Sequence, residues 1–465
     1  MIVITRDLAR RFRAVARRCV SGRPRGPAPP VVVQARSGTL TLWTRTGDAD
    51  LTYAGPTDGD DDTVLVPMAV LEAVEGTGPD PVELEVGPQL RGCARWSDRG
   101  IPRMYPFEAL LPGKPHSVPE PPDELHLLPE TFPTALHECG RTAARESTRF
   151  ALNQVQVRGT SGQVIGTDGR QALITGGFQF PFASDLLVPA VPAFGTRELA
   201  GEEVRVGRTS THLVVAAGPW SVWLPEDKGG RYPDVAAVVP RPVGGSVAGV
   251  DGRDAAALLD ALPHLPGAGD EDRPVTLDLN GWVVVRAKDT QGGAVREVVL
   301  TRSPAAGPPA RVAVDRKALS RALALGCHTL RLAGEGKPLI AEGDDRTFVS
   351  ICLDPGLVVG PDPAAVRTPT DDRAARPPRP VTRERKPPMK THESNGHTPG
   401  SRPDPPADAP DPLAEAEALK AALAEATHRA GRLVQALKHS RKQSRVLASA
   451  WTALKSLNLD PGGRP

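Results

Sequence analysis

The sequence predicts an α+β protein made of three repeated domains, followed by a disordered linker and a C-terminal helix. A chain of 465 residues is too long for one ordinary core and suggests about three domains of ~100–150 residues each. The same order of two helices and several β-hairpins recurs at intervals of roughly 115–120 residues, which indicates an internal repeat. Each unit is expected to place its helices on one face of an antiparallel sheet. The predicted segments are domains at 1–118, 124–245 and 246–356, a linker at 357–412 and a helix at 413–457.

The first repeat opens with a short strand and an amphipathic helix over residues 6–19. Leu8, Phe12 and Val15 form an apolar stripe at helical spacing, and arginines with the same spacing form an almost purely cationic face. Such a face favours a polyanion over plain solvation, because solvated faces usually mix both signs. Arginine-rich transit peptides and membrane-surface helices share this pattern. The strand-like start, the lack of a cleavage site and the lack of tryptophan disfavour both alternatives.

The rest of the first repeat alternates strands with one further helix. Strands are predicted at 31–35, 38–43, 50–53, 63–67, 82–86 and 89–96, with a helix at 68–75. The acidic loop 58–62 lacks the ligand spacing of a calcium-binding EF-hand, so we expect it to be solvated. A proline-rich connector at 116–123 marks the end of the domain.

The second repeat contains the most informative stretch of the chain, residues 149–174. Apolar residues alternate there as in half-buried strands. Asp168 and Gly169 predict a tight turn, because Asp caps the backbone locally and Gly tolerates a positive φ. A helix is predicted before this stretch, at 129–145. After it we expect a structured segment at 186–194 and strands at 204–206, 212–216 and 221–224.

The third repeat shows the same order of elements. Helices are predicted at 253–262 and 316–325, and strands at 275–279, 282–287, 297–301, 329–333, 338–342 and 346–353. Beyond it the composition changes. Residues 360–412 have almost no large apolar side chain, which predicts disorder. Residues 413–457 carry a heptad pattern weakened by alanine and serine, which leaves open a partner-dependent coiled coil or a solitary marginal helix.

The overall composition limits the classes of function. The net charge is +2, so any contact with nucleic acid must come from local patches. Five scattered cysteines without CxxC spacing predict a reducing cytoplasm and neither disulfides nor zinc. No apolar run approaches the ~20 residues of a membrane helix. The common nucleotide-binding, hydrolase and metalloprotease motifs are missing, so we expect no enzymatic activity, no metal and no cofactor.

Several short motifs resemble those of the bacterial β sliding clamp, the β subunit of DNA polymerase III. They are RxxLN at 149–153, TDG at 167–169, RYPD at 231–234, VVP at 238–240, GRP at 22–24 and GTLTL at 38–42. The resemblance covers residues 1–355 and implies three such domains per chain and a homodimeric ring around double-stranded DNA. It also implies a processivity factor in the bacterial cytoplasm, associated with the nucleoid, that tethers DNA polymerase and clamp-loader-type proteins through short linear motifs.

A ring that slides along DNA cannot read bases, so its inner side should offer diffuse cationic contacts to phosphates. Basic residues on or near the predicted helices suit such contacts. The candidate DNA-binding residues are Arg6, Arg10, Arg13, Arg17, Arg23, Arg141, Arg145, Arg316, Lys317 and Arg321.

The resemblance also implies a cleft between the second and third domains that binds peptides with apolar anchors. By resemblance, its positions are Leu152, Thr167, Gly169, Arg170, Gln171, Ala172, Pro240, Val349, Ile351 and Leu353. Arg170, Gln171 and Ala172 stand where the family usually has His, Arg and Leu, and the chain continues beyond the strand at 348–353. The loss of a Leu-sized wall at Ala172 removes about 1–2 kcal/mol of apolar contact for a bound anchor.

Two functions therefore remain open. The first is a non-enzymatic sliding clamp that encircles DNA as a dimeric ring. The second is a clamp-fold interaction scaffold that no longer encircles DNA.

Overall fold

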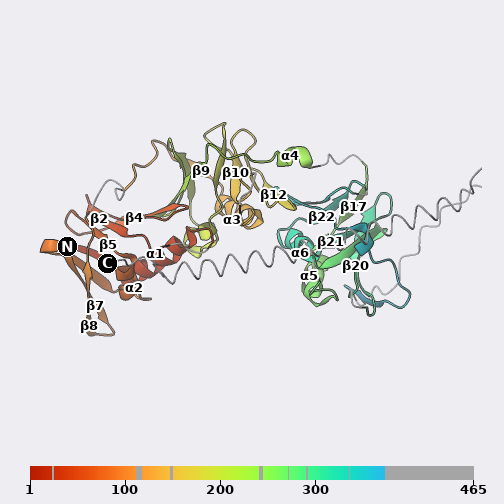
Figure 1. The fold of residues 1–465 in the computed structure, drawn as a ribbon, viewed down its shortest axis with the longest axis horizontal. Helices are drawn as coiled ribbons and strands as arrows, with labels where there is room; N and C mark the ends of the chain where they lie inside the picture. The colour runs from red at the N-terminus through yellow and green to blue at the C-terminus, as the bar shows by residue number, and fades with distance from the viewer. Residues whose placement is uncertain are drawn as a thin grey trace, which may run out of the picture. The chain divides into compact units, whose positions relative to one another are not determined.

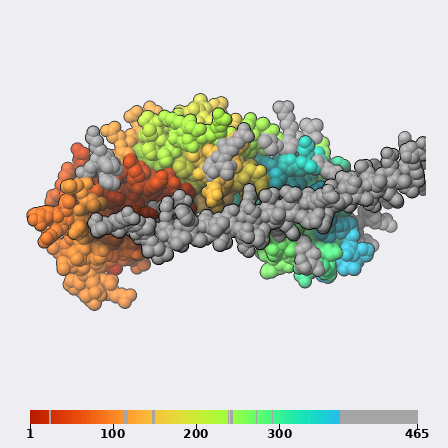
Figure 2. Space-filling model, in the orientation of Figure 1, coloured from red at the N-terminus to blue at the C-terminus, as the bar shows by residue number. Residues whose placement is uncertain are grey.

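The computed structural model describes residues 1–371 except 23–25, 112–117, 147–149, 240–243, 271, 290–291 and 335. The helix predicted at 413–457 and most of the predicted linker lie outside the described residues. Everything described belongs to one unit, Met1–Thr382, in which the elements follow one another in three repeats (Figure 1). Figure 2 shows the surface of these repeats, coloured by position along the chain. None of the described helices is long and apolar enough to cross a membrane.

The helices and strands recur in a common order in the three repeats, and the strands at 101–108, 126–128, 246–249 and 310–315 are additional to those that the sequence predicts. The first repeat contains β1 (Ile2–Thr5), α1 (Arg6–Arg18), β2 (Val31–Arg36), β3 (Thr39–Arg45), β4 (Asp50–Pro56), β5 (Asp62–Val66), α2 (Met68–Val74), β6 (Pro81–Val86), β7 (Arg91–Asp98) and β8 (Ile101–Glu108). The second contains β9 (His126–Leu128), α3 (Phe132–Thr142), β10 (Gln154–Arg158), β11 (Gln163–Thr167), β12 (Gln171–Thr175), β13 (Asp185–Pro189), the 3₁₀ turns η3 (Pro192–Gly195) and η4 (Arg197–Leu199), β14 (Val204–Arg208), β15 (His212–Ala217) and β16 (Trp220–Pro225). After α4 (Val235–Val238), the third contains β17 (Ser246–Gly249), α5 (Gly252–Ala261), β18 (Pro274–Asn280), β19 (Trp282–Ala287), β20 (Arg296–Ala306), β21 (Ala310–Asp315), α6 (Arg316–Ala324), β22 (Thr329–Leu332), β23 (Leu339–Glu342) and β24 (Arg346–Ser350).

The second repeat departs from the other two at its second helical segment. The first and third repeats have α2 and α6 there, whereas the second has only η3 and η4. Pro189, Pro192 and Gly195 lie within or next to this segment, and these residue types disfavour a longer α-helix.

Each repeat contributes two four-stranded halves to the sheets. The first half joins the first strand of the repeat to its last three strands, and the second half contains the four strands between the two helical segments. The first halves are β1-β6-β7-β8, β9-β14-β15-β16 and β17-β22-β23-β24. The second halves are β5-β2-β3-β4, β13-β10-β11-β12 and β21-β18-β19-β20.

Neighbouring repeats are joined by antiparallel pairing between these halves. At the first junction β4 pairs with β16, from Asp50 opposite Trp223 to Tyr53 opposite Trp220. At the second junction β12 pairs with β24, as in Ala172 opposite Val349. In both junctions the third strand of a second half, counted along the chain, pairs with the last strand of the next repeat's first half. The sheets therefore continue from one repeat into the next.

Aromatic packing supports the first junction on its helical side. The fully buried Trp220 of β16 lies 4.9 Å from the ring of Tyr53 and 6.3 Å from the ring of Phe12, measured between centroids. The indole nitrogen of Trp223 donates a hydrogen bond to Thr52 Oγ1 at 3.0 Å. These contacts connect α1 and β4 of the first repeat with β16 of the second.

The sequence explains why α1 starts and ends where it does. Thr5 Oγ1 accepts a hydrogen bond from Leu8 N at 3.1 Å and caps the first turn. Asp7 lies in the first turn, while Arg17 and Arg18 lie in the last, and both arrangements suit the helix dipole. The predicted apolar stripe of α1 is buried.

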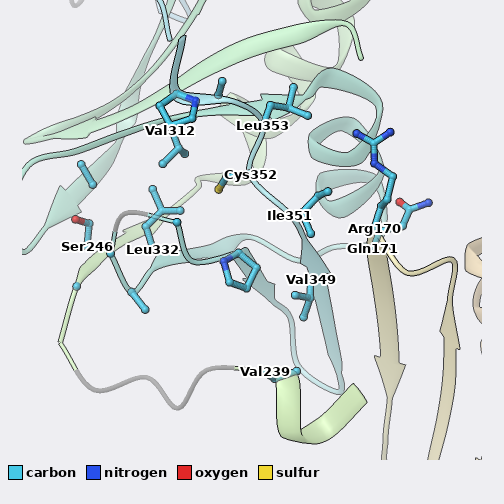
Figure 3. A pocket seen from close by; sticks show the side chains of 18 of the residues that line it. Arg170, Gln171, Val239, Ser246, Val312, Leu332, Val349, Ile351, Cys352 and Leu353 are labelled. Atoms are coloured by element: carbon cyan, nitrogen blue, oxygen red, sulfur yellow. The ribbon is translucent and has the colours of Figure 1, made fainter. Parts of the chain in front are cut away.

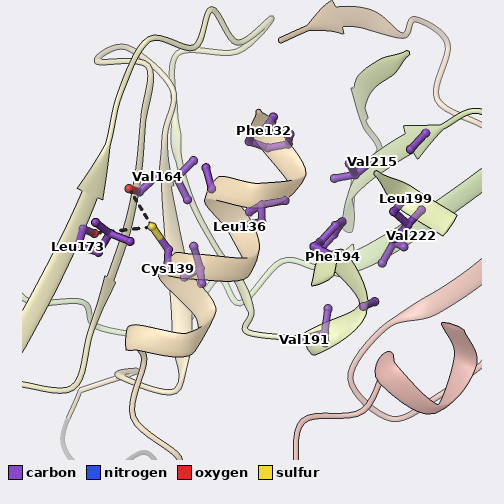
Figure 4. Packing of buried hydrophobic residues seen from close by; sticks show 14 of the residues in the cluster. Phe132, Leu136, Cys139, Val164, Leu173, Val191, Phe194, Leu199, Val215 and Val222 are labelled. Atoms are coloured by element: carbon purple, nitrogen blue, oxygen red, sulfur yellow. Dashed lines mark hydrogen bonds between the residues drawn. The ribbon is translucent and has the colours of Figure 1, made fainter. Parts of the chain in front are cut away.

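In the second repeat, α3 packs directly on β11 and β12 (Figure 4). Phe132 and Leu136 are buried, and the thiol of Cys139 points to the carbonyl oxygens of Val164 and Leu173 at 3.4 and 3.7 Å. A Cβ on Gly166 would lie 2.0 Å from Cys139 O, so only glycine permits this approach of helix to strand. Burial raises the pKa of the Cys139 thiol to about 12 and keeps it neutral.

The prediction of disorder from residue 357 onward does not hold for residues 366–371. Residues 366–369 form β25 (Val366–Pro369), which pairs in parallel with the first part of β20. Arg367 forms an ion pair with the buried Glu297 at 2.9 Å, and Thr370 donates a hydrogen bond to the buried Asp254 at 2.5 Å. The segment is ordered because acidic groups of the third repeat, far away in sequence, bind its polar side chains.

Candidate functional site

The turn between β11 and β12 forms one side of the candidate site. Gly169 has a φ of +87°, which glycine adopts at no steric cost. Asp168 Oδ1 accepts hydrogen bonds from the backbone nitrogens of Arg170 and Gln171, both at 2.8 Å, and Thr167 Oγ1 accepts one from Gly169 N at 3.1 Å. These bonds fix the turn locally, so β12 enters the junction with a defined register.

The opposite strand and the residues after it supply an apolar wall. Val349 lies opposite Ala172 in the pairing of β24 with β12. The wall then continues past the strand, because Ile351 N donates to Arg170 O at 2.9 Å and Leu353 N donates to Ala313 O at 2.8 Å. Ile351 stays 42% exposed. An exposed isoleucine held by the backbone of two repeats is suited to contact an apolar ligand.

These residues border a cleft of about 1040 Å³ at the junction of the second and third repeats (Figure 3). We call it the junction cleft. Its volume is in the upper range of pockets that bind small molecules or short peptides. Its lining is mainly apolar and includes Ala172, Pro233, Val235, Val239, Pro308, Pro309, Val312, Leu332, Val349, Ile351, Leu353 and Val358.

Beside the junction cleft, a small apolar cluster covers Ala172. Ile165, Ala172, Val235 and Val349 are buried together. The Tyr232 hydroxyl donates to Ile165 O at 3.2 Å, and burial raises the pKa of Tyr232, so the hydroxyl stays protonated. Ala172 thus belongs to the same buried cluster as Val235, while both residues also border the cleft.

The polar rim of the cleft also connects the two repeats. Arg170 forms an ion pair with Asp272 at 2.9 Å, with its side chain 59% exposed. Because the pair is solvated, it adds little to stability. Arg170 lines the edge of the cleft, where its guanidinium can contact polar groups of a bound peptide, whereas Asp272 does not line the cleft.

Most of the predicted cleft residues come together in the structure. Those that line the junction cleft are Thr167, Gly169, Arg170, Gln171, Ala172, Val349, Ile351 and Leu353. Leu152 lies next to Gly169 but does not line the cleft. Pro240 lies outside the described residues.

Sequence reasoning missed a large part of the cleft wall. Val235 directly follows the RYPD motif, and Val239 belongs to the VVP motif, so the only available signal was their closeness to these motifs and to Pro240. Val312, Leu332 and Val358 come from strands and a loop of the third repeat. No local pattern marks them, because their place in the cleft depends on how the second and third repeats pair.

Two of the predicted DNA-binding residues are buried. Arg13 is 3% exposed and forms ion pairs with Glu72 at 3.1 Å and with Glu75. Arg316 is 4% exposed and donates to the carbonyl oxygens of Leu265 and Pro266 at 2.7 and 2.5 Å. Their guanidinium groups are occupied within the fold, so a direct phosphate contact does not fit either residue.

Three further candidates are half-buried and have internal partners. Arg6 bonds Asp98 at 2.8 Å and the carbonyl of Val74 at 3.2 Å. Arg10 bonds Asp7 at 2.5 Å. Arg321 of α6 donates to Glu138 O at 2.7 Å, Arg141 O at 3.0 Å and Thr142 Oγ1 at 2.8 Å. Arg321 thereby caps the last turn of α3 and joins the third repeat to the second.

The remaining candidates are exposed at helix ends. Arg17 lies in the last turn of α1, Arg141 in the last turn of α3 and Lys317 in the first turn of α6, while Arg145 follows α3. Arg23 lies outside the described residues. A second groove of about 800 Å³ is lined by Arg141, Arg273 and Lys317, together with Glu138 and Asp315.

His137 of α3 lies near several of the arginines at these helix ends. Burial lowers the pKa of this imidazole first, and the charges of Arg141, Arg18 and Arg321 lower it further against the opposing effect of Glu138. Cations of α1, α3 and α6 therefore act on one point of the structure.

Known structures share this arrangement of elements, although no protein-family model matches the sequence and no curated protein is significantly similar to it. A DNA polymerase sliding clamp from Pseudomonas aeruginosa, solved with a ligand, aligns at 16% identity over 76% of this chain and 99% of its own, with a TM-score of 0.61. A DNA polymerase sliding clamp from Caulobacter crescentus aligns at 17% identity over the same shares, with a TM-score of 0.60. The described residues thus have the fold of bacterial DNA polymerase III β sliding clamps, as their motifs predict.

Proposed function

We propose that this protein is a clamp-type tether, which binds duplex DNA through cations at its helix ends and recruits partner proteins through the junction cleft. The observation that carries the proposal is the junction cleft itself. Both of its sides are fixed by backbone hydrogen bonds across two repeats, and it presents the exposed Ile351. Such a preformed apolar cleft favours a partner segment with one or two apolar anchors.

The chemistry of the cleft defines the ligand class. Full burial of one Leu- or Phe-sized anchor is worth about 1.5–3 kcal/mol, so two anchors are needed for useful affinity once ordering costs are subtracted. Arg170 at the edge of the cleft suits a polar or acidic flank on the peptide. The expected partners are proteins with a short linear segment of this type, such as a DNA polymerase or a clamp-loader-type protein.

A peptide-binding experiment tests recruitment. A fluorescein-labelled hexapeptide with adjacent Leu and Phe anchors is titrated with the full chain, and binding is followed by fluorescence anisotropy. Ile351→Asp should weaken binding about tenfold or more, because it removes an apolar contact and adds a desolvated charge. Leu127→Asp is the matched control, since Leu127 is also exposed (66%) but lies on β9, away from the cleft. Equal affinity of wild type and Ile351→Asp would refute a role for the cleft.

A second experiment tests the DNA contact. Arg141→Glu with Lys317→Glu should weaken binding to duplex DNA of any sequence and reduce the slope of log affinity against log salt by about one per lost phosphate contact. Arg205→Glu on β14 provides the control, because it is an exposed arginine of a strand. An unchanged salt slope in the double variant would exclude these helix ends from the DNA interface.

The alternative function, an interaction scaffold that does not encircle DNA, is favoured by one specific observation. The edge of β20 that faces away from β19 is already paired, with β25 at its first residues and with β17 at its last. Retention on nicked circular DNA separates the two functions. An encircling clamp is lost when the circle is linearised, whereas a scaffold with local DNA contacts shows no such dependence on topology.

A further inference from the structure

The three repeats define where a second copy of the chain would join. Each internal junction pairs the third strand of a second half, β4 or β12, with the last strand of the next first half, β16 or β24. The equivalent strands in the third and first repeats are β20 and β8. Ala305 and Ala306 of β20 already pair with β17, which leaves the part of this edge that begins at Arg296. Extension of the same pairing rule to a second copy would place β8 of one chain along the outer edge of β20 in the other.

In this chain, β25 occupies that edge of β20. Val366 N donates to Val295 O at 2.9 Å and Thr370 N donates to Val299 O at 3.0 Å, while Thr301 N donates to Thr370 Oγ1 at 3.2 Å. The strands run parallel, whereas both internal junctions are antiparallel. The segment covers the edge from Val295 to Thr301, where the partner strand would bind.

Side chains anchor this segment in the third repeat. Arg367 contacts Glu297, which is 3% exposed and also bonds Arg286 at 2.7 Å. Thr370 donates to Asp254 of α5, which is fully buried. Arg302 forms an ion pair with Asp371. Removal of β25 would leave the buried carboxylates of Glu297 and Asp254 with fewer partners, so the segment is part of the third repeat's polar network.

The other end of the array is also unsuited to pairing. The β7–β8 hairpin has a two-residue loop, Arg99 and Gly100, with φ values of 51° and 80°. In such a hairpin the flanking pair, Asp98 and Ile101, is hydrogen-bonded, and hydrogen-bonded pairs alternate from there. Pro102 and Pro106 therefore fall at positions whose nitrogen faces away from β7.

The outer edge of β8 thus lacks two backbone donors. Between Pro102 and Pro106 of β8, only Met104 has an N–H that faces outward. Among the described residues, no strand pairs with this edge. Proline on a sheet edge is a known way of preventing pairing with another chain. By contrast, the paired parts of β16 and β24 contain no proline.

We propose that residues 366–371 form an intramolecular cap on β20 that, with the prolines of β8, prevents ring closure with a second copy by strand pairing. The cap extends the proposed function, because it makes encirclement of DNA depend on release of β25. Its test involves neither DNA nor peptide, so it can fail independently of the proposed function.

The test compares full-length chains by sedimentation equilibrium and by hydrogen exchange. The release variant combines Arg367→Glu, which places a like charge beside Glu297, with Thr370→Pro, which removes the N–H to Val299 and the hydroxyl to Asp254. Arg367→Lys with Thr370→Ser is the matched control, because it keeps the cation and the hydroxyl. A third chain adds Pro102→Val and Pro106→Val to the release variant and restores the missing donors of β8.

The wild type and the control should be monomers, with slow exchange at the amides of Val366 and Thr370. The third chain should self-associate at least about tenfold more tightly than the wild type. A wild-type dimer that keeps these amides protected would overturn the proposal, as would rapid exchange of both amides in the wild type. A third chain that stays monomeric with unprotected β20 amides would overturn it as well. Should circular dichroism show that Thr370→Pro unfolds the chain, Thr370→Val replaces it and the same outcomes apply.

Discussion

The strands that pair at the junction of the second and third repeats, β12 and β24, have equivalents in β20 and β8, which do not pair with each other. At the junction, β12 and β24 pair over five residues, from Gln171 opposite Ser350 to Thr175 opposite Arg346. At the ends, β20 is covered by β25, and β8 has prolines on its outer edge. The same sheet architecture can therefore be continuous or terminated, depending on a few residues at the edges.

Side chains support the junction on both faces of the sheet, whereas the contacts that hold β25 on β20 are of another kind. Arg321 of α6 binds the last turn of α3 on the helical side, and the apolar cluster of Ile165, Ala172, Val235 and Val349 lies on the other strand face. The cap on β20 depends instead on a short parallel pairing, two ion pairs and one hydroxyl. We therefore expect the junction to be part of the cooperative fold and the cap to be the weaker element.

The largest expected effect concerns the core of the junction. Phe348 of β24 is 1% exposed and lies opposite Leu173 of β12. Phe348→Ala should lower the free energy of unfolding by about 3–5 kcal/mol, through lost apolar burial and the cavity that remains. Urea denaturation measures the change.

The matched change at the end of the array is Val366→Ala in β25. Val366 is 54% exposed, so this change should alter the free energy of unfolding by about 0.5 kcal/mol or less. Similar losses for the two variants would contradict the distinction between a cooperative junction and a weaker cap.

A smaller effect is expected on the helical side of the junction. Arg321→Ala removes the donors that satisfy the last carbonyls of α3, and it should cost about 1–3 kcal/mol. Lys317→Ala on the same helix is the control, because Lys317 is exposed, and it should cost about 0.5 kcal/mol or less. Thermal and urea denaturation of both variants measures these losses. Equal losses in the two variants would show that Arg321 does not stabilise the junction.

The elements that the sequence predicts best are those with local determinants. The turn at Asp168 is fixed by its own side chain, and α1 by the cap at Thr5, so both follow from neighbouring residues. The repeat order then predicts that the strand at 346–353 belongs to the third domain. The resemblance to sliding clamps adds the prediction that this strand borders a cleft between the second and third repeats.

The elements that the sequence does not predict depend on distant partners. Residues 366–369 contain one apolar side chain in a proline-rich context, and their order depends on Glu297 and Asp254. The helical pattern of α1 places Arg13 on a cationic face but cannot reveal that Glu72 and Glu75 bury it. Helical periodicity gives the face of a residue and does not give the partner that the tertiary fold brings to it.

The smallest expected effect is a dependence of stability on pH at His137. Burial and the nearby Arg141, Arg18 and Arg321 lower the pKa of this imidazole in the folded state. The unfolded chain, with an ordinary pKa near 6.5, then binds a proton more readily than the folded chain. Stability from this group is fully present above about pH 6.5 and falls as the pH drops through the folded pKa.

His137→Gln should therefore reduce the loss of unfolding free energy between about pH 7.5 and pH 5.5, because Gln carries no proton to bind. His264→Gln is the control, since His264 is exposed on a 3₁₀ turn. His212 adds to the same acid sensitivity, because burial also lowers the pKa of its imidazole, so the effect of His137→Gln is a reduction and not a complete loss. An unchanged pH dependence in His137→Gln would mean that burial and the nearby cations do not lower the pKa of His137 in the folded chain.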